Sequence, residues 1–268
     1  MIACRRRRWL NQCRRATRVL LLSSRQVERS CEMNKDEVCD QIRKIGVLPA
    51  IRVSSGKDAH FAAEAVTHGG IPIVEITMTI PGAVDLISHL VRSQPKVIVG
   101  AGTVLDTTTA HRCIDAGASF ITAPSFHANI VEFVAKENIA VLPGALTPTE
   151  IVAAWNAGAN FVKVFPCGPV GGDHYIKSLH ASLPQIPLIA AGGVNQQTAA
   201  DYILSGATAI GVGAELIPPE AIQRRQAQRI RELARRFLKL VRDARKEIEI
   251  WQQSQMVKEF TAADECEK

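Results

Sequence analysis

Short apolar segments rich in β-branched residues alternate with amphipathic stretches from Ile45 onward. The apolar segments recur about every 20 to 28 residues, which is the spacing of repeated strand–helix units. Eight of them are predicted as strands: residues 47–51, 72–76, 97–101, 120–122, 140–142, 161–164, 187–190 and 209–212. Because each segment is apolar almost throughout, we expect a parallel sheet that is buried on both faces.

The stretches between the predicted strands have helical periodicity. In residues 57–68 the side chains of Phe61, Ala62, Ala65 and Val66 fall on one face, which is typical of a helix that packs on a sheet. The stretch at 81–92 begins with proline, which is favoured in the first helical turn. Glycine follows four of the stretches, at Gly69-Gly70, Gly117, Gly158 and Gly206. A left-handed glycine there ends each helix and turns the chain into the next strand.

Eight such units in about 170 residues predict a single-domain parallel (β/α)8 TIM barrel. A doubly wound open sheet is the alternative, but no GxGxxG motif follows the first strand. We expect residues 36–44 to form a helix that plugs the bottom of the barrel, and residues 219 to about 251 to form one long helix. The predicted organisation is a leader over 1–32, the barrel over 33–218, and a C-terminal helix with a frayed tail over 219–268.

The formal charge of +6 is concentrated in the first 32 residues, where nine arginines stand against Glu28 and Glu32. The remaining residues have a net charge of −1, so the barrel has no basic face of the kind that binds nucleic acid. The leader lacks the features of a secretory signal. We interpret it as a dispensable or disordered segment before a native start at Met33, with a targeting sequence or an RNA-binding arm as alternatives.

The seven cysteines have no CxxC spacing, and the seven histidines form no pair at ligand spacing. Neither a disulfide framework nor a metal site is therefore expected. No run reaches the roughly 18 consecutive apolar residues of a membrane span. These features predict a cytoplasmic protein with no cofactor, no membrane association and no nucleic-acid partner.

The carboxyl ends of the strands build the active site of a TIM barrel, and two charged residues stand inside apolar segments there. Lys163 lies within FVKVFP and Glu75 within IVEIT. Burial disfavours an ammonium, and imine formation requires the neutral amine. A carboxylate on the opposite wall of the barrel interior can take up and return protons during the reactions of an imine. The structural alternatives are a lysine whose amine reaches water at the rim and a glutamate that serves in an ion pair.

Glycines follow the last two predicted strands, at Gly192, Gly193 and Gly213. In a TIM barrel the loops after these strands often bind phosphate through free backbone N–H groups at helix starts. Glycine also serves ordinary turns. The placement in both loops together favours a phosphate site.

At these residues the chain resembles the 2-keto-3-deoxy-6-phosphogluconate (KDPG) aldolase family, class I aldolases that include 4-hydroxy-2-oxoglutarate (KHG) aldolases. The resemblance spans residues 46–218. It rests on eight motifs in family order: AIR at 50–52, VEIT at 74–77, VGAGTV at 99–104, AP at 123–124, LPG at 142–144, KVFP at 163–166, AGGV at 191–194 and GVG at 211–213.

The resemblance implies a role for each of these residues. Lys163 would form the imine, and Glu75 would be the general acid and base. The residues that would contact the substrate are Arg52, Thr79, Thr103, Pro124 and Phe165, with Arg52 and Thr103 near its carboxylate. The residues that would hold the phosphate are Gly192, Gly193, Gly213 and Ala214. The family is commonly a homotrimer and needs no metal.

The implied reaction is the cleavage of 2-dehydro-3-deoxy-6-phosphogluconate to pyruvate and glyceraldehyde 3-phosphate, a step of the Entner–Doudoroff pathway of carbohydrate metabolism. Many members have threonine at Ala191 and serine at Ala214, and some have arginine at Thr79. These departures leave 4-hydroxy-2-oxoglutarate or another 2-oxo acid as an alternative substrate. Two other functions stay open: a sugar-phosphate epimerase or isomerase, and a non-catalytic trimeric scaffold that makes contacts through residues 219–251.

Overall fold

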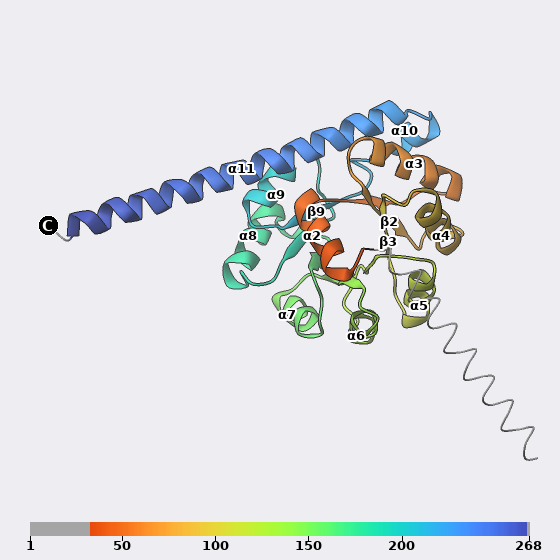
Figure 1. Ribbon diagram of the computed structural model, residues 1–268, viewed down its shortest axis with the longest axis horizontal. Helices are drawn as coiled ribbons and strands as arrows, with labels where there is room; N and C mark the ends of the chain where they lie inside the picture. The colour runs from red at the N-terminus through yellow and green to blue at the C-terminus, as the bar shows by residue number, and fades with distance from the viewer. Residues whose placement is uncertain (1–32, 267–268) are drawn as a thin grey trace, which may run out of the picture. The chain divides into compact units, whose positions relative to one another are not determined.

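Parallel strands alternate with helices around a barrel in the computed structural model (Figure 1). The structure describes the backbone of residues 33–266 and the side chains of residues 33–255. The predicted leader, residues 1–32, lies outside this range. The strands are β1 (Val47–Ile51), β2 (Ile73–Thr77), β3 (Ile98–Gly102), β4 (Phe120–Thr122), β5 (Ala140–Leu142), β6 (Gly144–Ala145), β7 (Val162–Val164), β8 (Leu188–Ala191) and β9 (Ala209–Val212).

Helices connect the strands and surround them (Figure 1). Seven of them precede β8 in the described chain: α2 (Lys35–Ile45), α3 (Gly56–His68), α4 (Ala83–Ser93), α5 (Thr107–Asp115), α6 (Ala128–Lys136), α7 (Pro148–Asn156) and α8 (Gly172–Ser182). Helix α9 (Ala199–Leu204) follows between β8 and β9. A short 3-10 helix, η2 (Gly168–Val170), precedes α8, and α10 (Pro219–Gln223) and α11 (Ala227–Cys266) follow the last strand. In the described range, no helix has both the length and the apolar character that crossing a bilayer requires.

The sheet has the strand order β5-β4-β3-β2-β1-β9-β8-β7-β6. Its two end strands, β5 and β6, are consecutive pieces of one extended segment that Pro143 divides. Proline has no N–H to donate to a ladder, but its carbonyl oxygen still accepts from the N–H of Lys163 at 2.9 Å. The ring of strands therefore closes across this segment. The prediction of a (β/α)8 barrel is confirmed, and the open doubly wound sheet is wrong.

The predicted strands differ from the observed ones by at most one residue at either end, apart from the additional β6. The prediction that left-handed glycines follow four of the helices is also confirmed. Four glycines that follow helices have φ angles between 94° and 102°: Gly70, Gly117, Gly158 and Gly206. Since side chains disfavour this region, glycine is what lets the chain turn sharply from helix into strand.

Helix α2 closes the amino-terminal end of the barrel, as the sequence predicts. Its side chains Val38, Cys39 and Ile42 are buried, and the Arg43 guanidinium lies 5.0 Å from the ring centroid of Phe161, just before β7. Burial raises the pKa of the Cys39 thiol to about 11, so this cysteine is an inert part of the core at neutral pH. The opposite end of the barrel is left for a site.

The predicted single helix over residues 219–251 is wrong, because the chain turns between α10 and α11. Arg225 adopts a φ of 52°, a left-handed conformation that an α-helix cannot contain. Its guanidinium lies 2.8 Å from the Asp58 carboxylate and 5.0 Å from the ring centroid of Phe61. The structure also differs at the tail, which continues as helix to Cys266 where the sequence predicts fraying.

Helix α11 packs on α3 and α9 through one apolar stripe (Figure 1). The buried residues of this stripe follow at alternating intervals of four and three: Ile230, Ala234, Phe237, Val241 and Ala244. This spacing keeps them on one face of a helix. Ile250 and Trp251, near the end of the described side chains, are 67% and 62% exposed. The stripe therefore attaches the first half of α11 to the barrel.

Arg245 joins α11 to the plug helix and to β9. Its Nη1 donates to the Lys44 carbonyl oxygen at 2.8 Å, and its Nη2 donates to the carbonyl oxygens of Arg43 and Thr208 at 2.6 and 2.9 Å. The carbonyls of Arg43 and Lys44 belong to the last turn of α2, where the helix dipole favours a cation. One side chain thus holds three segments that are far apart in the sequence.

We expect Arg245→Ala to lower the free energy of unfolding by about 2–3 kcal/mol, because it leaves partly buried carbonyl groups without a charged donor. Urea titration followed by circular dichroism measures this change. The matched control is Arg242→Ala, which removes an exposed guanidinium 3.9 Å from Asp243 and should change stability by less than about 0.5 kcal/mol. Equal effects of the two substitutions would contradict the assigned role of Arg245.

Candidate active site

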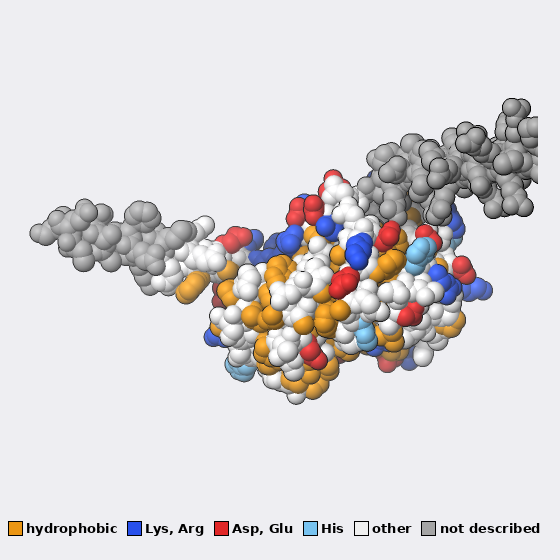
Figure 2. Space-filling model, turned by 90° about the horizontal axis from the view of Figure 1, so that it is seen from below, with side chains coloured by type: hydrophobic (Ala, Val, Ile, Leu, Met, Phe, Trp, Pro, Cys, Tyr) orange, Lys and Arg blue, Asp and Glu red, His pale blue; other side chains and the backbone are white. Residues whose placement is uncertain are grey.

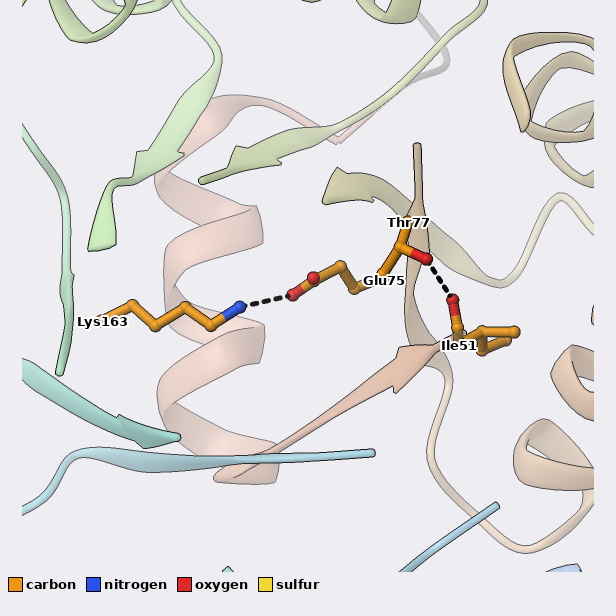
Figure 3. Close-up of polar contacts among 4 residues, drawn as sticks. All are labelled: Ile51, Glu75, Thr77 and Lys163. Atoms are coloured by element: carbon orange, nitrogen blue, oxygen red, sulfur yellow. Dashed lines mark hydrogen bonds and ion pairs between the residues drawn. The ribbon is translucent and has the colours of Figure 1, made fainter. Parts of the chain in front are cut away.

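Lys163 lies in the middle of β7 and points into the barrel (Figure 3). The strand pairs it with Gly144 on β6 and Ile189 on β8. Since side chains alternate along a strand, its neighbours Val162 and Val164 face the surrounding helices. The Lys163 side chain is only 11% exposed, so the amine is largely removed from water, as the sequence predicts.

Glu75 approaches Lys163 from the opposite wall of the barrel (Figure 3). Its carboxylate is 2% exposed, and its Oε2 lies 3.4 Å from Lys163 Nζ. The prediction that these two strands face the same lumen is confirmed. A buried carboxylate and a buried amine each need a partner, and here each supplies the other. The pair can exchange a proton and can hold a reacting group between them.

A glycine makes room for the Glu75 carboxylate. A Cβ atom at Gly102 on β3 would lie 2.5 Å from Glu75 Cδ and closer still to Oε1. Any side chain at this position would therefore push the carboxylate away from its observed place. The sequence motif that contains Gly102 thus fixes the geometry of a residue on the neighbouring strand.

A second glycine brings Pro124 close to the strand that neighbours Lys163. A Cβ atom at Gly144 would overlap the backbone carbonyl group of Pro124 and lie 2.7 Å from the backbone nitrogen of Ser125. Since Gly144 pairs with Lys163 in the sheet, the segment after β4 lies against the wall that carries the lysine. The structure thereby places the Pro124 backbone against the residue that pairs with Lys163.

Threonine hydroxyls tie together the ends of β1 and β2. Thr77 Oγ1 donates to the Ile51 carbonyl oxygen at 2.9 Å (Figure 3). The same Oγ1 lies 2.8 Å from Thr79 Oγ1. Arg52 follows Ile51 directly, and both Arg52 and Thr79 are exposed. These two side chains therefore lie at the mouth of the barrel and not inside it.

Two further predicted residues flank the site. The Phe165 ring centroid lies 5.7 Å from Lys163 Nζ, which gives the amine an aromatic neighbour. Thr103 has a φ of 59°, a left-handed conformation that is uncommon for threonine and that often occurs at functional sites. Both side chains are partly exposed. Phe165 directly follows β7, and Thr103 directly follows β3.

The loops after β8 and β9 contain unpaired donors. Among the described residues, the backbone N–H groups of Gly193, Val194, Ala214 and Glu215 donate no hydrogen bond. The prediction that these donors stand at helix starts is wrong. A turn over 195–198 separates Gly193 from α9, because the Asn195 side chain accepts from the next N–H groups, and α10 begins only at Pro219.

Cys167 and Tyr202 support the first of these loops, and no sequence signal indicated them. The Cys167 Sγ lies 3.5 Å from the Gly192 carbonyl oxygen, and the Tyr202 side chain bonds to the same thiol. Burial raises the pKa of both side chains above their ordinary values. Cys167 is therefore a neutral thiol that holds Gly192 in place.

Metal-ligating side chains do not gather in the part of the chain that the structure describes. No three His, Cys, Asp or Glu residues there are close enough to share an ion. The rings of His60 and His89 lie 5.3 Å apart on α3 and α4, away from the barrel interior and without a third ligand.

Comparison with known proteins agrees with the geometry of the site. A family model described as KDPG and KHG aldolase matches residues 38–233. The 2-dehydro-3-deoxy-phosphogluconate aldolase of Pseudomonas aeruginosa is 29% identical over 76% of this chain and 91% of its own. The KHG/KDPG aldolase of Escherichia coli K12 is 30% identical over 70% of this chain and 89% of its own.

A solved structure is similar over the same range. It is the KDPG aldolase from Legionella pneumophila with pyruvate captured at low pH as a covalent carbinolamine intermediate. The two structures align with a TM-score of 0.69 at 29% identity, over 74% of this chain and 96% of the other. The match to the family model covers most of this chain and includes both Lys163 and Glu75. This chain belongs to the KDPG and KHG aldolase family.

Proposed function

We propose that this chain is a class I aldolase that cleaves the C3–C4 bond of a 2-oxo-3-deoxy acid through an imine on Lys163. One observation carries the proposal: the Lys163 amine lies 3.4 Å from the Glu75 carboxylate inside a barrel whose buried side chains are mostly apolar. An amine in such a place can become a nucleophile by passing its proton to the carboxylate. A sugar-phosphate isomerase would need an acid–base pair but no buried lysine.

The reaction begins when neutral Lys163 adds to the C2 ketone and forms a carbinolamine. Glu75, which holds the proton that Lys163 gave up, gives it to the departing hydroxyl, so water leaves and a protonated imine forms. The imine accepts the electron pair of the C3–C4 bond as this bond breaks, while Glu75 takes the proton of the C4 hydroxyl. An aldehyde departs and an enamine remains. Glu75 then returns a proton to C3, and hydrolysis of the imine releases pyruvate.

The side chains at the mouth of the barrel fit the pyruvoyl end of such a substrate. The Arg52 guanidinium is exposed there and suits a carboxylate, to which it can donate two hydrogen bonds. Thr103 and Thr79 supply further hydroxyl groups. The Phe165 ring and Pro124 supply apolar walls, which keep water from the imine.

The loops after β8 and β9 fit the far end of the substrate. Their unpaired N–H groups, with Gly192, Gly193, Gly213 and Ala214, can donate to a phosphate, which favours 2-dehydro-3-deoxy-6-phosphogluconate as the substrate. One observation favours 4-hydroxy-2-oxoglutarate as a second candidate. Ala191 and Ala214 offer no hydroxyl groups, and a carboxylate follows at Glu215.

We further propose that the protein is cytoplasmic and forms a homotrimer. Figure 2 views the side of the barrel that carries α5, α6 and α7 and shows hydrophobic side chains spread across it. Leu105, before α5, is 54% exposed and Val152 on α7 is 37% exposed. Exposed apolar side chains of this kind are suited to subunit contacts.

We expect Lys163→Met to abolish pyruvate release, because no other group on the barrel walls can form the imine. Glu75→Gln should retain the imine but lower kcat by roughly 10²–10⁴-fold, the usual contribution of a general acid–base group. A coupled lactate dehydrogenase assay measures both variants. If Lys163→Met turned over while Glu75→Gln did not, an isomerase-type mechanism would replace the proposed one.

Gly102→Ala tests whether the position of the Glu75 carboxylate matters. The added methyl group must displace the carboxylate, so kcat should fall by about tenfold or more, as for other displaced acid–base groups. The control is Gly56→Ala, where a Cβ atom meets no atom within 4 Å. Steady-state kinetics measure both variants. If a folded Gly102→Ala variant turned over at the wild-type rate, the position of the carboxylate would be unimportant.

The phosphate site is tested by comparing two substrates. We expect kcat/KM for 2-dehydro-3-deoxy-6-phosphogluconate to exceed that for 4-hydroxy-2-oxoglutarate, because only the former carries a phosphate at the far end of its chain for the unpaired N–H groups. Added inorganic phosphate should inhibit the first reaction competitively. The opposite preference, without inhibition by phosphate, would assign the second substrate and remove the phosphate site.

A further inference from the structure

Thr122 carries a buried hydroxyl group without a partner. Among the residues with described side chains, four polar or charged residues are buried: Glu75, Thr77, Thr122 and Lys163. Three of them have hydrogen-bond partners, and Thr122 Oγ1 has none. Buried hydroxyl groups in folded proteins are almost always paired with protein or with ordered water. Ordered water or a substrate atom is therefore the expected partner of Thr122 Oγ1.

The Thr122 side chain points into the barrel. Its neighbours Ile121 and Ala123 face outward, toward Ile130 and Val131 of α6. Since successive side chains on a strand point to opposite faces, Thr122 faces the lumen. Its hydroxyl is thus on the same side of the sheet as the amine–carboxylate pair.

The sheet register places Thr122 next to the Glu75 carboxylate. Strands β3 and β4 pair as far as Ala101 and Ile121, so the next residues, Gly102 and Thr122, are neighbours. The Glu75 carboxylate occupies the space that a side chain at position 102 would fill. Adjacent strands are about 4.8 Å apart. The two side chains therefore approach one another on the same face, and because Thr122 Oγ1 makes no hydrogen bond to the carboxylate directly, one water oxygen can bridge them.

The other neighbour of Thr122 leads to the lysine. Strand β5 pairs Thr122 with Leu142. Two residues further along the same segment, Gly144 shares the inward face and pairs with Lys163. Thr122 therefore lies on the wall between Glu75 and Lys163, where a small molecule has three polar groups within reach.

We propose that Thr122 Oγ1 holds a water molecule against the Glu75 carboxylate and that this water relays protons to the substrate. A buried water needs two to four polar partners, and this place offers a hydroxyl, a carboxylate and an amine. In the enamine step, Glu75 gives a proton to the water while the water gives another to C3. Thr122 is a positioning residue here, since it orients the water and keeps its own proton.

This inference rests on the proposed aldolase chemistry, and its test has a readout that does not need the aldehyde. The wild-type protein should exchange the C3 hydrogens of pyruvate with deuterium from solvent, which is followed by NMR. Thr122→Val has nearly the shape of threonine and removes the hydroxyl. It should slow the exchange about tenfold or more, a part of the 10²–10⁴-fold that acid–base catalysis contributes. Thr122→Ser should restore most of the rate.

The stability of the variants separates positioning from a structural role. Thr122→Val removes an unpaired hydroxyl, so the melting temperature should stay the same or rise. The matched control is Thr77→Val, which takes the donor from the Ile51 carbonyl oxygen and should lower the melting temperature.

Two outcomes overturn the inference. Thr122→Val exchanging pyruvate hydrogens at the wild-type rate would show that the hydroxyl holds no relaying water. A fall in melting temperature with unchanged exchange would make Thr122 a structural residue. Absence of exchange in the wild-type protein is a third and distinguishable outcome, because it overturns the aldolase proposal itself and this inference with it.

Discussion

A buried amine and a buried carboxylate face each other across an apolar barrel, and the rest of the site depends on this pair. Removing two charges from water is unfavourable, and the loss is offset only when the groups are close and well oriented. Lys163 and Glu75 meet this condition because they come from opposite walls of one closed sheet. Gly102 supplies the space that lets the carboxylate reach across. The pair is held in place for a reaction that needs a neutral amine.

The fold separates stability from chemistry by using the two ends of the barrel differently. At the amino-terminal end α2 fills the opening. Arg245 fastens α11 to α2 through the carbonyls of Arg43 and Lys44, and to the start of β9 through that of Thr208. At the carboxyl end the strands finish in short loops that carry hydroxyls, a guanidinium and unpaired N–H groups. Polar groups can be exposed there because the closed end already supplies the packing.

The sequence alone was sufficient to predict the barrel, most of the strand bounds and the candidate pair of Lys163 and Glu75. Each of these depends on patterns that are local in the chain, such as an apolar run, a glycine after a helix, or a lone charge within a strand. The turn at Arg225 was missed because its left-handed backbone is held by Asp58 and Phe61, which are distant in the sequence. Thr122 was missed because threonine is an ordinary strand residue, and only the three-dimensional structure shows that its hydroxyl is unpaired.

The central claim is that Lys163 forms an imine with a 2-oxo acid. Reduction with borohydride in the presence of pyruvate, followed by peptide mass mapping, tests it most directly because reduction makes an imine permanent. The account predicts a stable adduct on the peptide that contains Lys163 and on no other lysine. A folded protein that gives no adduct, or an adduct on a different lysine, would contradict it.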